Sequence, residues 1–164
     1  MDQLTKQLAE ARLSPGVRVD VLGELFGFRL FYNSGAAFSL GTGITPVLTV
    51  FACLAVLAML VALARTWSTS WAVSVGVLLG GASGNLVDRL TRAPGVGRGE
   101  VVDFFELPNF PIFNVADMAV VSGAVLIVLL SLRDVPFAAT PVDDTPAAAG
   151  GTVAPDAAQP PRDA

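Results

Sequence analysis

The stretch that decides the fold reads GGASGNLVDRL (residues 80–90) and, after a short polar passage, GEVVDFFELPNFPIFNVAD (residues 99–117). It holds three aspartates, Asp88, Asp103 and Asp117, and two asparagines, Asn85 and Asn114, at the edges of two long apolar segments. Ionisable groups at membrane depth are costly, so they are usually functional and usually have partners. Three carboxylates that converge on one membrane face would suit acid/base chemistry or ion handling.

The composition is that of an integral membrane protein. Charged residues make up 15% and hydrophobic residues 53% of the chain, whereas a soluble domain carries about 25% charged residues. Residues 30–64 and 66–87 contain no charge, and residues 107–132 contain only Asp117. A spanning helix needs ~20 mostly apolar residues. We therefore predict three complete membrane-spanning helices, at residues 45–64, 71–90 and 113–133.

The charges and the cysteine and histidine content argue against several functions. Residues 1–133 carry equal numbers of acidic and basic residues, so the net charge of −4 belongs to residues 134–164. A nucleic-acid partner would require a basic surface, and we expect none. With no histidine and the single Cys53, we expect no internal disulfide, no metal site and no cofactor. The Ala/Pro/Asp-rich residues 134–164 are predicted to be disordered.

The segments outside these helices have patterns of their own. Residues 1–12 are helix-forming but too polar and too short to span, and Asp2 and Lys6 share one face because they lie four apart. Apolar and polar residues alternate in the first half of residues 14–44, which predicts a small β-hairpin outside the bilayer, followed by a loop. Residues 91–112 are interpreted as an extramembrane excursion whose apolar end returns to the membrane interface.

Three glycines in the second spanning helix predict close helix packing. Gly76, Gly80 and Gly84 recur every four residues, and small residues at that spacing let another helix approach. Asp88 is the next step along the same ridge, so we expect it to point toward the packed interior. Arginines flank both ends of the helices, so charge alone predicts no orientation in the membrane.

Two interpretations are open for the start of the third spanning helix. Asn114 is a favoured N-cap residue, and Asp117, three residues on, suits the positive end of a helix. The same side chains could instead belong to a site, and Asp88 could form an interfacial ion pair with Arg89. Two carboxylates held close together cannot both ionise easily, so they share a proton. One can then activate a water molecule while the other donates to a carbonyl oxygen, which is peptide hydrolysis without a metal.

The motifs resemble, in order and spacing, those of lipoprotein signal peptidases (signal peptidase II), the bacterial membrane aspartic peptidases. The similar stretches, which cover about residues 1–133, are DQLTK (2–6), NSGAAFSLG (33–41), GNLVDRL (84–90), EVVDFFEL (100–107) and FPIFNVAD (110–117). The resemblance implies an all-α membrane protein, a bundle of four transmembrane helices with a small extracytoplasmic β-cradle. Residues 1–133 would form the membrane-embedded peptidase domain.

The resemblance also implies an activity and a set of residues. The enzyme would remove signal peptides from prolipoproteins by cleaving before a diacylglyceryl-modified cysteine, at the extracytoplasmic face of the bacterial cytoplasmic membrane. Its expected partners are the prolipoprotein and membrane lipids, and we expect a monomer. The catalytic pair would be Asp103 and Asp117. Supporting or substrate-binding roles would fall to Asn33, Gly35, Asn85, Asp88, Arg89, Asn114, Ala116, Asp2 and Lys6, with Asp88 the second candidate for catalysis.

The chain departs from the family pattern at its start. The family has a spanning helix before DQxTK, and here that motif begins at Asp2. We therefore interpret residues 1–12 as the end of a truncated first helix. Two other functions stay open: a non-enzymatic membrane carrier or assembly subunit, and a lipoprotein-binding paralogue with an incomplete first helix. The extramembrane hairpin and the lack of an internal repeat argue against a carrier.

Overall fold

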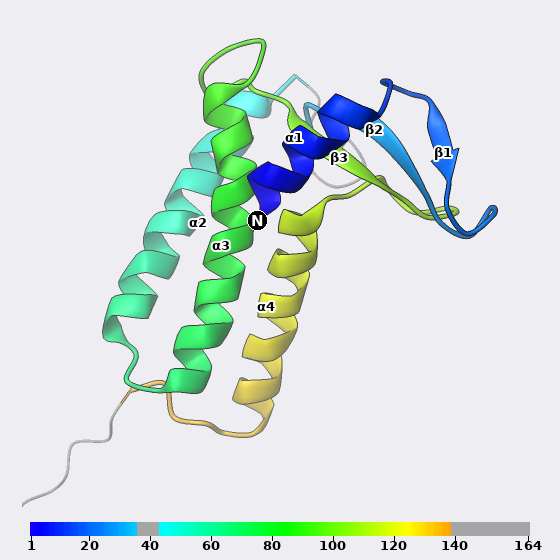
Figure 1. Ribbon diagram of the computed structural model, residues 1–164. Coiled ribbons are helices and arrows are strands. Elements are labelled where there is room, and N and C mark those ends of the chain that lie inside the picture. The colour runs from blue at the N-terminus through cyan, green and yellow to red at the C-terminus, as the bar shows by residue number, and fades with distance from the viewer. Residues whose placement is uncertain (36–42, 139–164) are drawn as a thin grey trace, which may run out of the picture.

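Three long helices make up one part of the molecule, and a small sheet with a short helix makes up the other (Figure 1). The computed structural model describes residues 1–35 and 43–138, so the predicted loop after residue 35 and most of the predicted disordered tail lie outside the described residues. The element order is α1 (Asp2–Arg12), β1 (Arg18–Asp20), β2 (Gly27–Asn33), α2 (Thr45–Arg65), α3 (Thr69–Thr91), β3 (Val101–Glu106) and α4 (Val115–Leu132).

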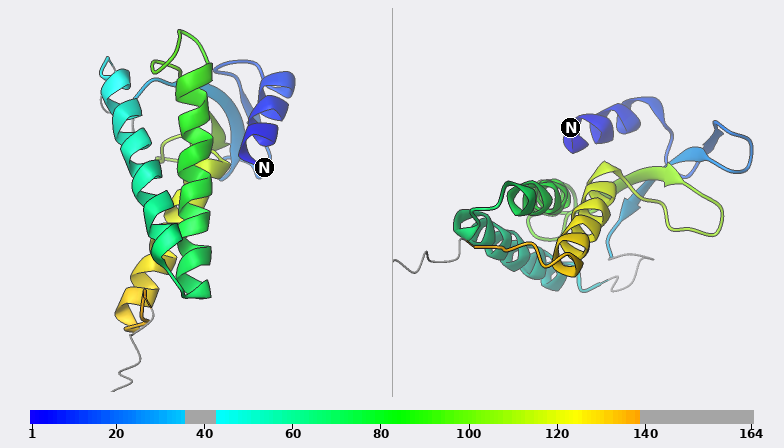
Figure 2. Two further views of the ribbon diagram at one scale, coloured as in Figure 1. Left: turned by 90° about the vertical axis from the view of Figure 1, so that its left-hand side faces the viewer. Right: turned by 90° about the horizontal axis from the view of Figure 1, so that it is seen from below.

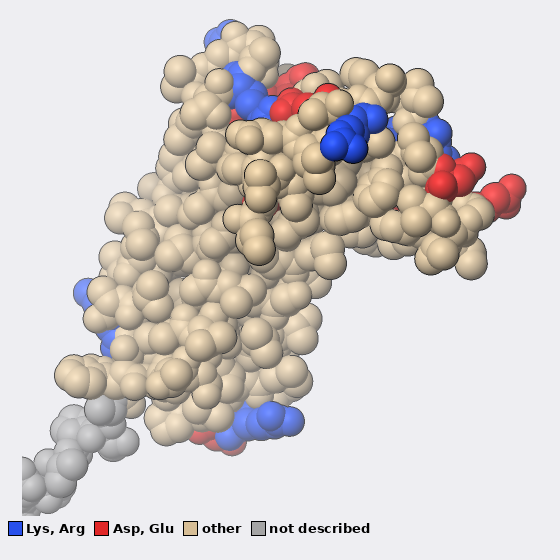
Figure 3. All heavy atoms as spheres, in the orientation of Figure 1, with Lys and Arg blue, Asp and Glu red and all other residues tan. Residues whose placement is uncertain are grey.

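Helices α2, α3 and α4 are long and apolar enough to cross a membrane. Each begins and ends within two residues of its predicted range. Their outward surfaces carry large apolar side chains, among them Phe51, Leu54 and Val125, all more than half exposed. In the face that Figure 3 shows, charged side chains gather toward the two ends of the molecule, and a band of uncharged atoms lies between them. This is the distribution that lipid around the middle of the bundle requires.

Helix α3 is central, with α2 and α4 packed against it. The approach of α4 depends on two glycines. A Cβ atom on Gly123 of α4 would come within 2.7 Å of the backbone nitrogen of Leu78, and one on Gly81 of α3 would collide with the carbonyl oxygen of Ala116. The backbones of the two helices therefore touch where side chains are missing.

The predicted glycine ridge is wrong at two of its three positions. A Cβ atom on Gly76 or Gly80 would meet open space. At 3.6 residues per turn, a strict spacing of four drifts around the helix. The contact face of α3 instead follows Gly81, Gly84 and Asp88, which are three and four residues apart and buried.

The sheet is antiparallel in the order β1-β2-β3. The predicted hairpin is confirmed, with Val19 opposite Phe28. The third strand is a correction, because residues 101–106 pair with β2, with Asp103 opposite Phe31, instead of re-entering the membrane interface as a loop. The chain is therefore helical with a three-stranded sheet and not all-α. β-branched and aromatic residues in VVDFFE favour a strand, but its partner lies some seventy residues away.

The core beneath the sheet decides which way Asp103 points. Ala9 of α1 packs with Leu30 of β2 and with Val102 and Phe104 of β3 in one buried cluster. Successive side chains of a strand point to opposite faces, so Asp103 lies on the face away from α1. Figures 1 and 2 show α1 and the sheet together at the end of the bundle where α2 begins and α3 ends.

The segment after α4 crosses the opposite end of the bundle. The Nε1 of Trp71 donates to the carbonyl oxygen of Val135 at 2.9 Å, and the Oγ1 of Thr66 donates to that of Phe137 at 2.8 Å. The rings of Trp71 and Phe137 meet edge to face, with centroids 5.3 Å apart. Residues 134–138 thus have defined contacts, whereas the sequence predicted disorder from residue 134 onward.

Candidate active site

A cavity of about 1070 Å³ lies between the sheet and the facing ends of α3 and α4. Its volume is slightly above the range that is usual for small-molecule sites, about 300–1,000 Å³. One part of the lining is polar and includes Arg29, Asn33, Asn85, Arg89, Asp103, Glu106 and Asp117. The other part is apolar and includes Leu107, Phe110, Ile112, Phe113, Met118 and Val121. The cavity could therefore hold a ligand with both polar and apolar portions.

Asp103 of β3 is 1% exposed. Its Oδ1 accepts a hydrogen bond from the Nδ2 of Asn114 at 2.6 Å, and its Oδ2 accepts one from the Nδ2 of Asn33 at 3.0 Å. Burial, followed by the charge of Asp117, raises the pKa of Asp103 from 3.8 to about 7, against the lowering effect of the two amide donors. The carboxyl group therefore exchanges a proton near neutral pH.

Asp117 lies in the first turn of α4, and the predicted cap is confirmed. The side chain of Asn114 accepts a hydrogen bond from the backbone nitrogen of Asp117 at 3.0 Å. In return, the Oδ2 of Asp117 accepts one from the backbone nitrogen of Asn114 at 3.0 Å. These two hydrogen bonds form a capping box. The Oδ1 of Asp117 accepts from the Nδ2 of Asn85 at 2.8 Å. The cap therefore fixes the carboxyl group of Asp117 at the cavity wall.

Asn114 links the two carboxyl groups. It is completely buried, and its Nδ2 donates both to Asp103 and, at 3.1 Å, to the Oδ1 of Asn85. Its backbone nitrogen donates to Asp117. One residue at the helix start therefore fixes both carboxyl groups in one hydrogen-bonded unit, so the capping and site interpretations are compatible.

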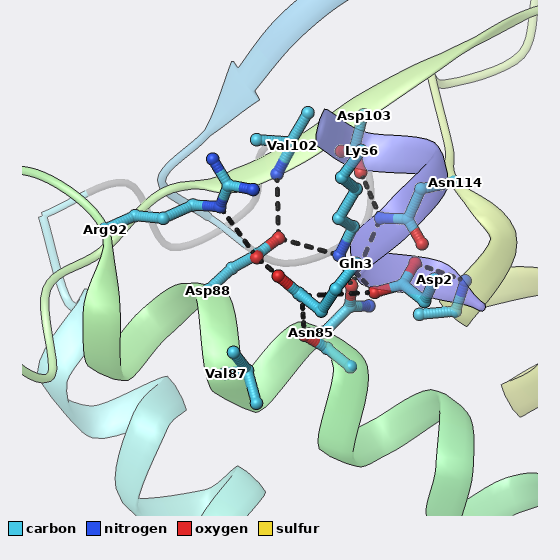
Figure 4. A network of polar contacts seen from close by, with 12 residues as sticks. Asp2, Gln3, Lys6, Asn85, Val87, Asp88, Arg92, Val102, Asp103 and Asn114 are labelled. Atoms are coloured by element: carbon cyan, nitrogen blue, oxygen red, sulfur yellow. Dashed lines mark hydrogen bonds and ion pairs between the residues drawn. The ribbon is translucent and has the colours of Figure 1, made fainter. Parts of the chain in front are cut away.

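The third aspartate, Asp88, is fully buried but does not line the cavity. It lies under α1, where both carboxylate oxygens have two partners each (Figure 4). Its Oδ2 pairs with the Nζ of Lys6 at 2.7 Å and accepts from the backbone nitrogen of Val102 at 3.2 Å. Its Oδ1 accepts from Arg92 at 2.7 Å and from Gln3 at 2.9 Å. Asp88 therefore lies at the same end of the bundle as Asp103 and Asp117 but outside the cavity that those two line.

The predicted interfacial ion pair between Asp88 and Arg89 is also absent from the described residues, where Asp88 pairs with Lys6 and Arg92. Arg89 instead donates to two carbonyl oxygens. Its Nη2 donates to the carbonyl oxygen of Gly35, and its Nη1 donates to the carbonyl oxygen of Gly99 at 3.4 Å. The guanidinium thus connects the segment after β2 with the one before β3, beside the cavity.

Helix α1 contributes Asp2 and Lys6, which pair at 3.0 Å as their spacing predicts. The Oδ1 of Asp2 accepts from the backbone nitrogen of Ala116 at 3.1 Å, so it adds a second carboxylate to the start of α4. A Cβ atom on Gly84 would come within 2.6 Å of the other oxygen of Asp2. Glycine at position 84 therefore lets α1 dock on α3.

The sequence interpretation missed three polar partners. Arg92 lies four residues after Asp88 on α3, a spacing from which their pair could have been predicted. Arg92 also pairs with Glu10 of α1 at 2.5 Å. Gln3 lies in the DQLTK stretch, but no local pattern indicated that α1 would dock beside Asp88.

These features define a class of membrane protein in which two carboxyl groups, bridged by a buried asparagine, face a cavity at one end of a helical bundle. The family model described as Signal peptidase (SPase) II matches residues 1–133. The chain therefore belongs to the signal peptidase II family.

Similar proteins include the lipoprotein signal peptidases of Mycolicibacterium smegmatis, Mycobacterium avium and Rhodococcus jostii. Each is 50% identical over 132 residues, which cover 80% of this chain and 56%, 72% and 66% of the three relatives. The chain thus spans little more than half the length of the first. Two solved structures of bacterial membrane enzymes, obtained in meso at 2.3 and 1.9 Å resolution, are also similar. Their TM-scores are 0.73 and 0.69 at 27% and 28% identity, covering 81% of this chain and 81% and 86% of theirs.

Proposed function

We propose that this protein is an aspartic endopeptidase that removes signal peptides from prolipoproteins, cleaving before the diacylglyceryl-modified cysteine. Family membership and the names of the relatives support this activity. The observation that carries it is the pair of Asp103 and Asp117, joined through Asn114 at the wall of one cavity. A shared proton between two such carboxyl groups supplies an acid and a base without a metal.

The surroundings of the two carboxyl groups suggest their roles. Asp103 keeps a proton near neutral pH because its pKa is about 7. Both oxygens of Asp117 accept hydrogen bonds at the start of α4, and we assign Asp117 the role of the base. Asp117 then removes a proton from water, the hydroxyl attacks the peptide carbonyl carbon, and Asp103 gives its proton to the carbonyl oxygen. As the carbon–nitrogen bond breaks, the departing amine takes the proton from Asp117 and the carbonyl oxygen returns its proton to Asp103.

The cavity suits a lipidated peptide. Its polar part would hold the scissile bond, with Asn33, Gly35 and Arg89 on the substrate side. Its apolar part, formed by residues 107–113 and the first turns of α4, would hold the acyl chains. The exposed apolar side chains of α2 and α4 would contact membrane lipids. We place the sheet and the site at the extracytoplasmic face of the bacterial cytoplasmic membrane, in a chain that acts as a monomer.

A cleavage assay tests this proposal. The full chain, reconstituted in liposomes, is given a diacylglyceryl-modified prolipoprotein and the same precursor without the lipid. We expect cleavage of the first only. Asp103→Asn and Asp117→Asn should each lower turnover by at least about a hundredfold, while Asp20→Asn, which alters an exposed aspartate of β1, should not. Near-normal turnover by either folded dyad variant would show that the catalytic pair is misassigned. Lipid-dependent binding without cleavage would favour the lipoprotein-binding paralogue.

A further inference from the structure

Lys6 is a buried cation that pairs with two carboxylates and also has a third, uncharged partner. Its side chain is completely inaccessible, and it pairs with Asp2 at 3.0 Å and with Asp88 at 2.7 Å. A lysine ammonium has three N–H donors and no acceptor. The third donor goes to the Oδ1 of Asn85 at 2.8 Å, toward the candidate active site (Figure 4).

This third bond determines which way the amide of Asn85 faces. Because an ammonium can only donate, the atom of Asn85 that faces Lys6 must be the oxygen. The same oxygen accepts from the Nδ2 of Asn114 at 3.1 Å. The amide nitrogen is therefore left to face the Oδ1 of Asp117, to which it donates at 2.8 Å. A flipped amide would place its N–H groups against two donors and its oxygen against a carboxylate.

A continuous path thus runs from α1 to the catalytic pair. It passes from the ammonium of Lys6 to the amide of Asn85 and on to the carboxylate of Asp117. The path supplies one of the two hydrogen bonds that the carboxyl oxygens of Asp117 accept, and the helix cap supplies the other. Other charged groups that share the cavity with Asp117 are Asp103 of β3, Arg89 of α3, Arg29 of β2 and Glu106 of β3.

We propose that Lys6 is a positioning residue for the reaction, acting through Asn85 to aim a hydrogen-bond donor at Asp117. This inference rests on the proposed function, in which Asp117 is the base. Lys6 contacts neither carboxyl group of the pair and does not itself line the cavity, so it takes no direct part in the chemistry. Its effect should appear in kcat more than in KM, because substrate contacts are unchanged while the base is misoriented.

The test is a double-mutant cycle on the full chain in liposomes. Lys6→Met, Asn85→Ala and the double variant are compared by kcat, KM and melting temperature. Each single variant should lower kcat by roughly tenfold to a hundredfold, with little change in KM. The double variant should be no worse than the poorer single variant, because both changes remove the same donor from Asp117. Arg12→Met, which removes an exposed positive charge at the far end of α1, should leave kcat unchanged.

A structural role alone would give a different pattern. Lys6→Met would then lower the melting temperature and the folded fraction, while kcat per folded molecule would stay normal. If Lys6 and Asn85 instead acted independently of each other, their separate losses of kcat would multiply in the double variant. Either result overturns the proposal. Lys6→Gln provides a second comparison if Lys6→Met does not fold, because it keeps an N–H donor for Asn85 without the charge. Lys6→Gln should retain more activity than Asn85→Ala. If the two variants lose the same activity per folded molecule, the inference is overturned.

A readout independent of turnover separates this inference from the proposed function. Infrared titration of the buried carboxyl groups reports where the shared proton lies. Lys6→Met and Asn85→Ala should displace the same carboxyl titration, and Arg12→Met should not displace it. If the wild type cleaves no prolipoprotein, the proposed function fails, while the titration still decides whether Lys6 controls the pair. If the carboxyl titration is the same in both variants as in the wild type, Lys6 does not control the carboxyl pair and the inference is refuted.

Discussion

The carboxyl group of Asp103 shows how strongly a single residue depends on its surroundings. The same side chain would ionise near pH 3.8 in water, and here its pKa is about 7 because it is buried and because of the negative charge of Asp117. The two amide donors, from Asn33 and Asn114, lower the pKa but do not offset the burial. Asp88, equally buried, is surrounded by Lys6 and Arg92 and serves as an anchor for α1 and β3. The partners of each aspartate, more than its burial, separate the proposed acid from the anchor.

The raised pKa of Asp103 predicts how activity and stability depend on pH. The folded protein binds a proton at Asp103 between about pH 4 and pH 7 that the unfolded chain does not bind, so the free energy of unfolding should fall as pH rises through this window. Activity should also fall as pH rises through about 7, because the proposed acid loses its proton.

Melting temperature and kcat/KM, both measured from pH 4 to pH 9, check this prediction. Asp103→Asn cannot titrate, so its melting temperature should vary less with pH in the same window, while Asp20→Asn should follow the wild type. The assignment of the proton to Asp103 would be contradicted if the melting temperature of the wild type rose between pH 4 and pH 7 and that of Asp103→Asn rose in parallel.

Elements differed in how far the sequence could predict them. Apolar runs located α2, α3 and α4, because a membrane helix must be apolar along its whole length. Alternation located the hairpin of β1 and β2, and the Asn114–Asp117 spacing predicted the cap of α4. These are local patterns. The strand β3 depends on pairing with β2 far back in the chain, and the partners of Asp88 on α1 depend on where α1 docks. No local pattern contains that information.

The contact between α3 and α4 gives a prediction at the scale of elements. Gly123→Ala should lower the free energy of unfolding by about 1–3 kcal/mol, because its Cβ atom would press on the backbone of Leu78. Gly80→Ala is the matched control, since its Cβ atom would meet open space. Alanine favours a helix over glycine by up to about 1 kcal/mol, so this control should be neutral or stabilising. Thermal melting in one detergent compares the two variants, and equal melting temperatures would contradict the packing described.

The whole molecule has two polar ends and an apolar middle. One end holds α1, the sheet and the cavity, and the other holds the turn between α2 and α3 together with residues 134–138 (Figure 1). The ion pairs that join α1 to α3 all lie at the first end. A membrane around the middle would therefore leave the candidate site at one surface, where a water molecule and the peptide of the proposed lipidated substrate could both reach it.

Cysteine labelling in intact bacterial cells tests this arrangement. The native Cys53 is exposed on α2, about 12 Å from the first residue of the helix at 1.5 Å per residue, so it should face lipid. A membrane-impermeant maleimide should label Cys53 only after the membrane is dissolved in denaturing detergent. In a Cys53→Ser background, Arg98→Cys at the sheet end should be labelled in intact cells, because we place that end outside. Thr69→Cys, at the start of α3, should be labelled only after permeabilisation.

The labelling pattern separates the possible errors. Reaction of Cys53 in intact membranes would show that α2 does not face lipid at that point, whatever the orientation. Labelling of Thr69→Cys but not Arg98→Cys in intact cells would place the sheet and the cavity on the cytoplasmic side. The catalytic pair could then still exist, but it would lie on the wrong side of the membrane for a prolipoprotein whose mature part has been exported, so the proposed substrate would have to be abandoned.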